Sequence, residues 1–99
     1  WQKSAQEIHN LVRGLDSWPG AYTMLAGKTY KIWRTCLTAR DTTAEPGTVL
    51  AADKKKGLFV AAGDAELEIL ELQAPGKKRM RAVDYLNGHD FPLPARFEG

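Results

Sequence analysis

The chain has 99 residues, 43% of them hydrophobic and 26% charged, with a formal net charge of +2 at pH 7. This length allows one modest hydrophobic core, so we expect a single domain over residues 1–99, and no apolar stretch approaches the ~20 residues of a transmembrane helix. The mild net charge argues against a polyanion-binding surface that covers the whole molecule. Because the chain begins with Trp1 rather than Met, we expect it to be a piece of a longer protein.

The first predicted element is a helix over Ala5–Arg13. Ser4 and Glu7 have the S-x-x-E spacing of a capping box, in which each side chain accepts a hydrogen bond from the backbone N–H of the other residue. Four apolar residues follow at i, i+3, i+4, i+7 spacing and predict one core-facing stripe. They are Ile8, Leu11, Val12 and Leu15.

Beyond Gly20 the pattern changes to short runs that are typical of strands. In the last run the apolar phase slips by one residue at Ile69–Leu70, and a slip requires a bulge or a bend in the strand. Small barrels use such bends to curl a sheet. We therefore expect a mainly β protein with two short helices, an OB-like barrel of five or six strands with an N-terminal helix. The predicted strands are Ala21–Leu25, Tyr30–Ala39, Thr48–Ala52, Leu58–Ala62 and Glu66–Leu72.

The chain closes with a short predicted helix and a tail. Ala82, Val83 and Leu86 would form the buried side of this helix, which Asn87 and Gly88 would end. The tail over residues 89–99 contains two prolines and no periodicity, so we expect it to lie extended along the surface.

Residues capable of catalysis or metal binding are few and are not spaced for either role. His9 and His89 lie far apart and near no cysteine, so no zinc site is predicted. Cys36 is the single cysteine, which fits a reducing cytoplasm, and we expect it to be packed or half-packed in its strand. No nucleophile, base and orienting group occur together, so no catalytic residue is predicted.

Half of the basic residues fall into two tight groups without an acid inside either: Lys54–Lys56 and Lys77–Arg79 with Arg81. Lysines at a hairpin tip are usually solvated and discourage aggregation. The second group stands between the last strand and the last helix, where cations are mildly unfavourable near a helix N-terminus. An extended polyanion held through its phosphates would offset that repulsion, and the residues alone leave this role and a solvated turn equally open. We expect Trp1, Trp18, Trp33 and Phe59 to be packed rather than presented to bases.

Three segments carry a resemblance to a known family. They are "SAQEIHNLVRGLDSWPGAY", "GKTYKIWR" and "PGTVLAADKKKGLFVAAGDAELEILELQAPGKKRMRAVDYLNG". In this order they resemble the C-terminal domain of the methionyl-tRNA formyltransferases, and the resemblance runs from about Trp1 to Gly88, which is nearly the whole chain. The most specific part is L-Q-x-x-G-K-K-x-M at Leu72–Met80, since R-G-L-D-x-W-P-G-A is shared with related hydrolases and sugar formyltransferases.

The resemblance implies a C-terminal tRNA-binding domain of a larger cytoplasmic enzyme. In that family an N-terminal domain binds 10-formyltetrahydrofolate and carries the catalytic Asn, His and Asp, and the formyl group is transferred to the amino group of initiator methionyl-tRNA. The OB-like domain of that family holds the tRNA through the backbone of the tRNA. None of those catalytic residues can be assigned in this chain, so we expect it to contain no catalytic centre, no cofactor and no metal.

The resemblance also orders the candidate tRNA contacts. Lys77, Lys78 and Arg79 match the basic motif of the family directly, whereas the other candidates follow from charge and neighbourhood. These are Arg81, Lys31, Arg34, Lys54, Lys55 and Lys56.

Two alternatives remain open at this point. The chain could be the C-terminal domain of a formyltetrahydrofolate hydrolase-like enzyme or of a nucleotide-sugar formyltransferase, with a different acceptor. It could also be a free-standing OB-fold module for nucleic acid or a structural adaptor. The sequence upstream of Trp1 would separate these alternatives.

Overall fold

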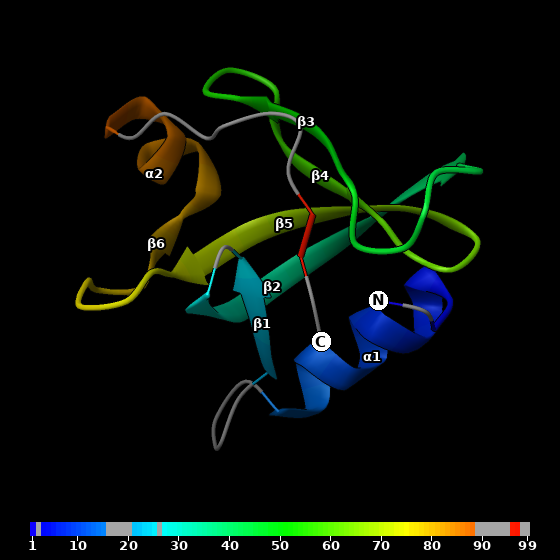
Figure 1. Ribbon diagram of the computed structural model, residues 1–99, viewed down its shortest axis with the longest axis horizontal. Coiled ribbons are helices and arrows are strands. Elements are labelled where there is room, and N and C mark those ends of the chain that lie inside the picture. The colour runs from blue at the N-terminus through cyan, green and yellow to red at the C-terminus, as the bar shows by residue number, and fades with distance from the viewer. Residues whose placement is uncertain (2, 16–20, 26, 89–95, 98–99) are drawn as a thin grey trace.

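The computed structural model of the protein describes residues 1, 3–15, 21–25, 27–88 and 96–97. Within these residues the chain forms two helices and six strands (Figure 1). In chain order they are α1 (Ala5–Leu15), β1 (Ala21–Leu25), β2 (Lys28–Asp41), β3 (Val49–Asp53), β4 (Gly57–Ala61), β5 (Ala65–Gln73), β6 (Met80–Arg81) and α2 (Ala82–Gly88). Neither helix is long and apolar enough to cross a membrane.

The strands form one curled sheet in the order β1-β2-β5-β4-β3, and every described pairing is antiparallel. The 14-residue β2 pairs with β5 along most of its length. The opposite edge of β5 is shared, because β4 pairs with its first half and β6 with its second half. β5 is therefore the central strand, and the turn that leaves it lies close to the N-terminal part of β2, where Lys31 pairs with Gln73.

The predicted bends occur in both long strands. The β2–β5 register shifts between Ile32 and Thr35 and again between Leu37 and Asp41. In β5 the buried positions change phase between Ile69 and Leu72, as the slip in the apolar pattern predicted. These irregularities curl the sheet into a half-barrel. The predicted mainly β, OB-like class is confirmed.

Helix α1 packs along β2 and begins at the predicted capping box. The Ser4 N–H donates to Glu7 Oε1 at 3.2 Å, and the Glu7 N–H donates to Ser4 Oγ at 3.1 Å. Ile8 and Val12 are buried against the sheet, but Leu11 of the predicted stripe is 45% exposed. The face that contacts β2 is thus narrower than the apolar spacing predicted.

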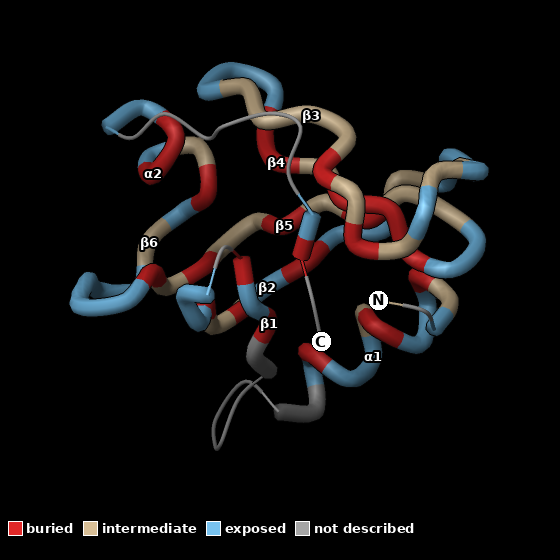
Figure 2. Tube along the Cα trace, viewed as in Figure 1, coloured by how far each residue is buried: buried red, intermediate tan, exposed pale blue. Residues whose placement is uncertain are grey.

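The core lies between α1, α2 and the concave side of the sheet (Figure 2). Leu58, Leu67, Ile69 and Leu72 of β4 and β5 are fully buried. Phe97 is only 2% exposed, so the prediction of a surface tail is wrong at this residue. Its backbone N–H donates to Gly47 O at 2.7 Å, and this extended attachment brings the aromatic ring into the core without any periodicity in the sequence. The remainder of the predicted tail, residues 89–95 and 98–99, lies outside the described residues.

The segment between β5 and α2 differs from the prediction in one respect that matters for the basic group. The turn at Pro75 and Gly76 leads into β6, not directly into the helix. A two-residue strand has no periodicity that a sequence pattern could detect. Lys77, Lys78 and Arg79 therefore belong to a hairpin turn beside the sheet, and the helix N-terminus follows only at Ala82.

Candidate functional site

The β5–β6 turn presents its cations to solvent from a fixed backbone. Lys77, Lys78 and Arg79 are exposed. The Lys77 N–H donates to Ala74 O at 3.1 Å, and Gln73 Nε2 donates to Lys77 O at 3.0 Å. Neither lysine forms an ion pair with any residue that the structure describes. The turn is thus ordered by its backbone, and both ammonium groups remain available to an anion.

A tryptophan of β2 links this turn to the sheet. Lys31 Nζ lies 4.1 Å and Arg79 Cζ 4.5 Å from the centroid of the Trp33 ring, distances typical of cation–π contacts. The Trp33 Nε1–H donates to Gln73 Oε1 at 3.1 Å. The half-buried ring is therefore packed, as predicted, but against cations at the surface. Trp18, for which packing was also predicted, lies outside the described residues.

A carboxylate of β5 holds the two arginines together. Arg79 Nε donates to Glu71 Oε1 at 2.7 Å, and Arg34 Nη1 donates to Glu71 Oε2 at 3.4 Å. The hydrogen bond from Arg79 is the main reason that the pKa of Glu71 lies below its usual value. The Arg34 and Arg79 side chains remain 62% and 43% exposed, so much of each guanidinium can still donate to a ligand. These side chains form a group that we call the Trp33 cluster: Lys31, Trp33, Arg34, Glu71 and Arg79.

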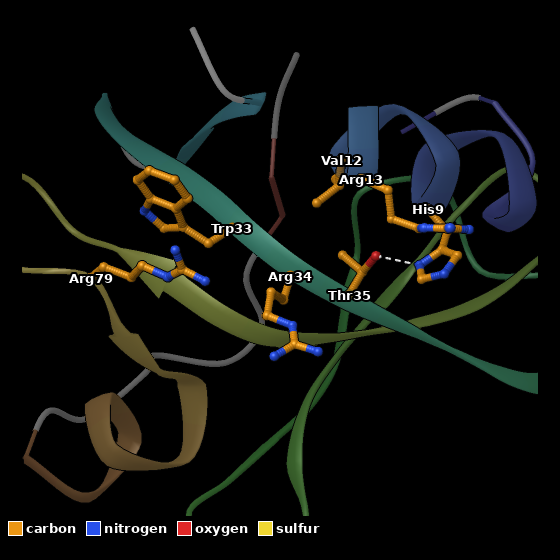
Figure 3. Close-up of a pocket in the computed structure, with 7 residues that line it drawn as sticks. All are labelled: His9, Val12, Arg13, Trp33, Arg34, Thr35 and Arg79. Carbon is orange, nitrogen blue, oxygen red and sulfur yellow. Dashed lines mark hydrogen bonds between the residues drawn. The ribbon is translucent and has the colours of Figure 1, made fainter. Parts of the chain in front are cut away.

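The Trp33 cluster borders a surface groove of about 510 Å³ between α1 and β2 (Figure 3). His9 Nδ1 lies 2.7 Å from Thr35 Oγ1, a hydrogen bond that joins the helix to the strand across this groove. No motif or spacing in the sequence assigns His9 or Arg13 to a site. Only the packing of α1 on β2 brings these side chains beside the arginines, and no local pattern encodes that contact. The lining residues are His9, Val12, Arg13, Trp33, Arg34, Thr35 and Arg79.

Arg81 lies next to this group but faces α2. Its Nε donates to Asp84 Oδ2 at 2.9 Å, and this ion pair lowers the pKa of Asp84. Arg81 and Arg34 both line a second surface hollow of about 320 Å³, which also contains Glu68 and Glu71. Arg81 and Arg34 are therefore neighbours, as predicted, and each forms an ion pair, Arg81 with Asp84 of α2 and Arg34 with Glu71 of β5.

The lysines of the β3–β4 turn are not brought to the Trp33 cluster. Figure 1 shows this turn at the opposite side of α2 from the β5–β6 turn. Asp53 Oδ1 accepts hydrogen bonds from the backbone N–H groups of Lys55 at 2.7 Å and Lys56 at 3.1 Å. These bonds lower the pKa of Asp53. The two hydrogen bonds explain the conformation of the turn by contacts within the turn itself. The side chains of Lys54, Lys55 and Lys56 are exposed.

The remaining reactive side chains have structural surroundings. Cys36 is exposed, so the prediction that it packs in its strand is wrong, because the bulges of β2 turn this position outward. The Tyr30 and Tyr85 hydroxyl oxygens lie 3.3 Å apart, and burial raises the pKa of Tyr85 to about 12. Among the described residues, no group of three His, Cys, Asp or Glu side chains could hold a metal ion. The arrangement offers hydrogen-bond donors and positive charge to an anion.

Comparison with known proteins places these features in a family context. The model of the family described as "Formyl transferase, C-terminal domain" matches residues 1–90. A methionyl-tRNA formyltransferase of Bacillus subtilis is 47% identical over 89 residues, which cover 89% of this chain and 28% of the relative. One from Clostridium novyi is 42% identical over 93 residues, which cover 94% of this chain and 30% of the relative. The chain thus spans less than a third of the length of these curated relatives.

Proposed function

Because the chain belongs to the family of formyl transferase C-terminal domains, we propose that it is the tRNA-binding domain of a methionyl-tRNA formyltransferase. Its role is to hold the initiator methionyl-tRNA through backbone phosphates. Such contacts fix the position of a nucleic acid without recognising its sequence. The name shared by the relatives supports the choice of a tRNA as the partner.

The observation that carries this proposal is the concentration of cations around Trp33. Lys31, Arg34 and Arg79 come from β2 and from the β5–β6 turn, and Trp33 and Glu71 hold them close together. Lys77 and Lys78 extend the same positive surface along the turn. Phosphate-binding proteins use donors of this kind, because each neutralised phosphate releases condensed counterions.

In this proposal the chemistry takes place on another domain of the same cytoplasmic enzyme. That N-terminal domain binds 10-formyltetrahydrofolate, and the formyl group moves to the amino group of the methionine on the tRNA. The present chain supplies no catalytic residue and contributes affinity and orientation. Holding the acceptor stem in register with a distant centre is a typical use of remote binding energy.

The test replaces Lys77, Lys78 and Arg79 together by alanine in the 99-residue chain. Fluorescence anisotropy with labelled initiator tRNA at 0.1 M salt should show a loss of affinity of about tenfold or more, because up to three phosphate contacts are removed. All three side chains are exposed, so circular dichroism and the melting temperature should show a folded variant. An unchanged tRNA affinity in the folded triple variant would rule out the proposed role of the turn.

A further inference from the structure

The groove between α1 and β2 extends the positive surface beyond the residues that the proposed function uses. Figure 3 shows Trp33 and Arg79 at one end and His9 and Arg13 at the other, with Arg34 between them. We propose that this groove is a second phosphate-binding subsite for the RNA backbone, with Arg13 as its contact on α1. This inference rests on the proposed function and deepens it.

The charge of the lining supports an anionic occupant. Arg13, Arg34 and Arg79 come from three different parts of the chain, and no acidic residue is among the lining residues that the structure describes. Arg13 is exposed and forms no ion pair with any residue that the structure describes. Its position in the last turn of α1 is favourable for a cation, because the helix dipole is negative there. That effect accounts for a cation on the helix, but not for its placement beside two further guanidinium groups.

The rigidity of the groove supports a binding role as well. Its two walls are joined by the contact between His9 Nδ1 and Thr35 Oγ1 at 2.7 Å. The guanidinium groups of Arg34 and Arg79 each form an ion pair with Glu71, and Arg79 also contacts the Trp33 ring. Side chains that are already ordered lose less conformational entropy on binding, which favours affinity. The guanidinium groups of Arg34 and Arg79 are therefore ordered before a ligand binds.

The shape of the site favours a phosphodiester chain over a free nucleotide. Pockets for small ligands are concave and enclose most of the ligand surface. Here the Arg34 and Arg79 side chains are 62% and 43% exposed, so the groove is open along its side. It also continues into the β5–β6 turn through Arg79, which belongs to both surfaces. A backbone that contacts Lys77 and Lys78 could thus pass on to Arg34 and Arg13.

The experiment compares Arg13→Gln with Lys3→Gln in the 99-residue chain. Both side chains are exposed and each substitution removes one positive charge, but Lys3 does not line the groove. With labelled initiator tRNA as the probe, R13Q should weaken binding about fivefold at 0.1 M salt and lower the slope of log affinity against log salt by about 0.7–0.9. K3Q should change the affinity less than about twofold, as expected for a charge outside the interface.

The outcomes separate this inference from the proposed function. If R13Q behaves like K3Q while the triple variant of the β5–β6 turn loses affinity, the groove is not a subsite and the proposed function stands. If R13Q weakens binding and the triple variant does not, Arg13 contacts the RNA, while the roles of Lys77 and Lys78 in the turn and of Arg79 in both surfaces fall. No effect of either variant overturns both. Uridine diphosphate provides the last arm: micromolar binding that R13Q abolishes would identify a nucleotide pocket and contradict a backbone subsite.

Discussion

The two lysine-rich turns of the sheet look alike in sequence and differ in their surroundings. At the β3–β4 turn, Lys54–Lys56 project from a backbone that closes on its own Asp53 carboxylate. At the β5–β6 turn, Lys77–Arg79 lie beside a neighbouring strand, where Arg79 contacts Trp33 and Glu71. The first turn is a local structure, whereas the second belongs to a surface built from several elements.

This difference shows why charge density along the chain is a weak indicator of a binding site. Three consecutive lysines can all be solvated, because the side chains at a hairpin tip can each extend into water. A binding surface needs cations from separate segments that are held in one place. Around Trp33 this is achieved by one ring, one carboxylate and the register that pairs Lys31 with Gln73.

The glycines of the two turns offer the first way to sharpen the comparison. Gly57 after the lysine triplet has φ +122°, and an added Cβ would lie 2.7 Å from Glu68 Oε2. Gly76 before the basic turn has φ +72°, with nothing within 4 Å of an added Cβ. We expect Gly57→Ala to lower the free energy of unfolding by about 2 kcal/mol, since φ +122° is strained for an L-residue. Gly76→Ala should cost about 1 kcal/mol, the usual penalty of the left-handed region.

Urea denaturation of both variants measures these costs. A larger loss for Gly76→Ala than for Gly57→Ala would contradict the backbone geometry assigned to the two turns. The left-handed region is itself tolerated in this chain, because Ala39 adopts φ 61° within β2. Ala39 therefore shows that an alanine can adopt the left-handed conformation that Gly76→Ala would require.

Glu71 provides a smaller effect that depends on pH. Because its pKa is lowered in the folded protein, mainly by Arg79, its ion pairs stabilise the fold above the ordinary value of 4.5, and this stabilisation is lost as the pH falls through the lowered pKa. Glu71→Gln should therefore lower the free energy of unfolding by about 0.5–1 kcal/mol at pH 7. The difference between E71Q and the parent chain should disappear toward pH 3.

Asp53→Asn is the matched variant in the other turn, since the pKa of Asp53 is also lowered. Its main partners are backbone N–H groups of its own turn, whereas those of Glu71 are side chains from β2 and the β5–β6 turn.

The coupling between Arg79 and Glu71 can be measured by urea titrations at several pH values. In a chain that already carries Arg79→Gln, E71Q should lower the free energy of unfolding much less than it does in the parent chain. Full additivity of R79Q and E71Q would show that the pair does not connect the turn to the sheet.

Local patterns predicted most of the fold. The capping box gave the start of α1, and the phase slip at Ile69–Leu70 predicted the bend of β5. What the sequence did not reveal were features that depend on distant partners. The two-residue β6 exists only because Met80 and Arg81 pair with β5, and Phe97 is buried only because its segment attaches to Gly47.

The candidate site was predicted less completely. The family motif indicated Lys77, Lys78 and Arg79, and charge and neighbourhood suggested Lys31 and Arg34. Trp33, Glu71 and Arg13 were missed as members of a site. The contacts of Glu71 and Trp33 with Arg79 join residues 8 and 46 positions apart, and Arg13 depends on the packing of α1 on β2, so no spacing in the sequence could indicate them.

The salt dependence of tRNA binding tests the central claim most directly, because its slope counts neutralised phosphates. The measurement compares the 99-residue chain with two triple variants, Lys77, Lys78 and Arg79 to alanine and Lys54, Lys55 and Lys56 to alanine. Our account predicts that the first variant lowers the slope of log affinity against log salt by about 2 to 3 and that the second leaves it unchanged. An equal reduction in both variants, or a reduction only in the second, would contradict it.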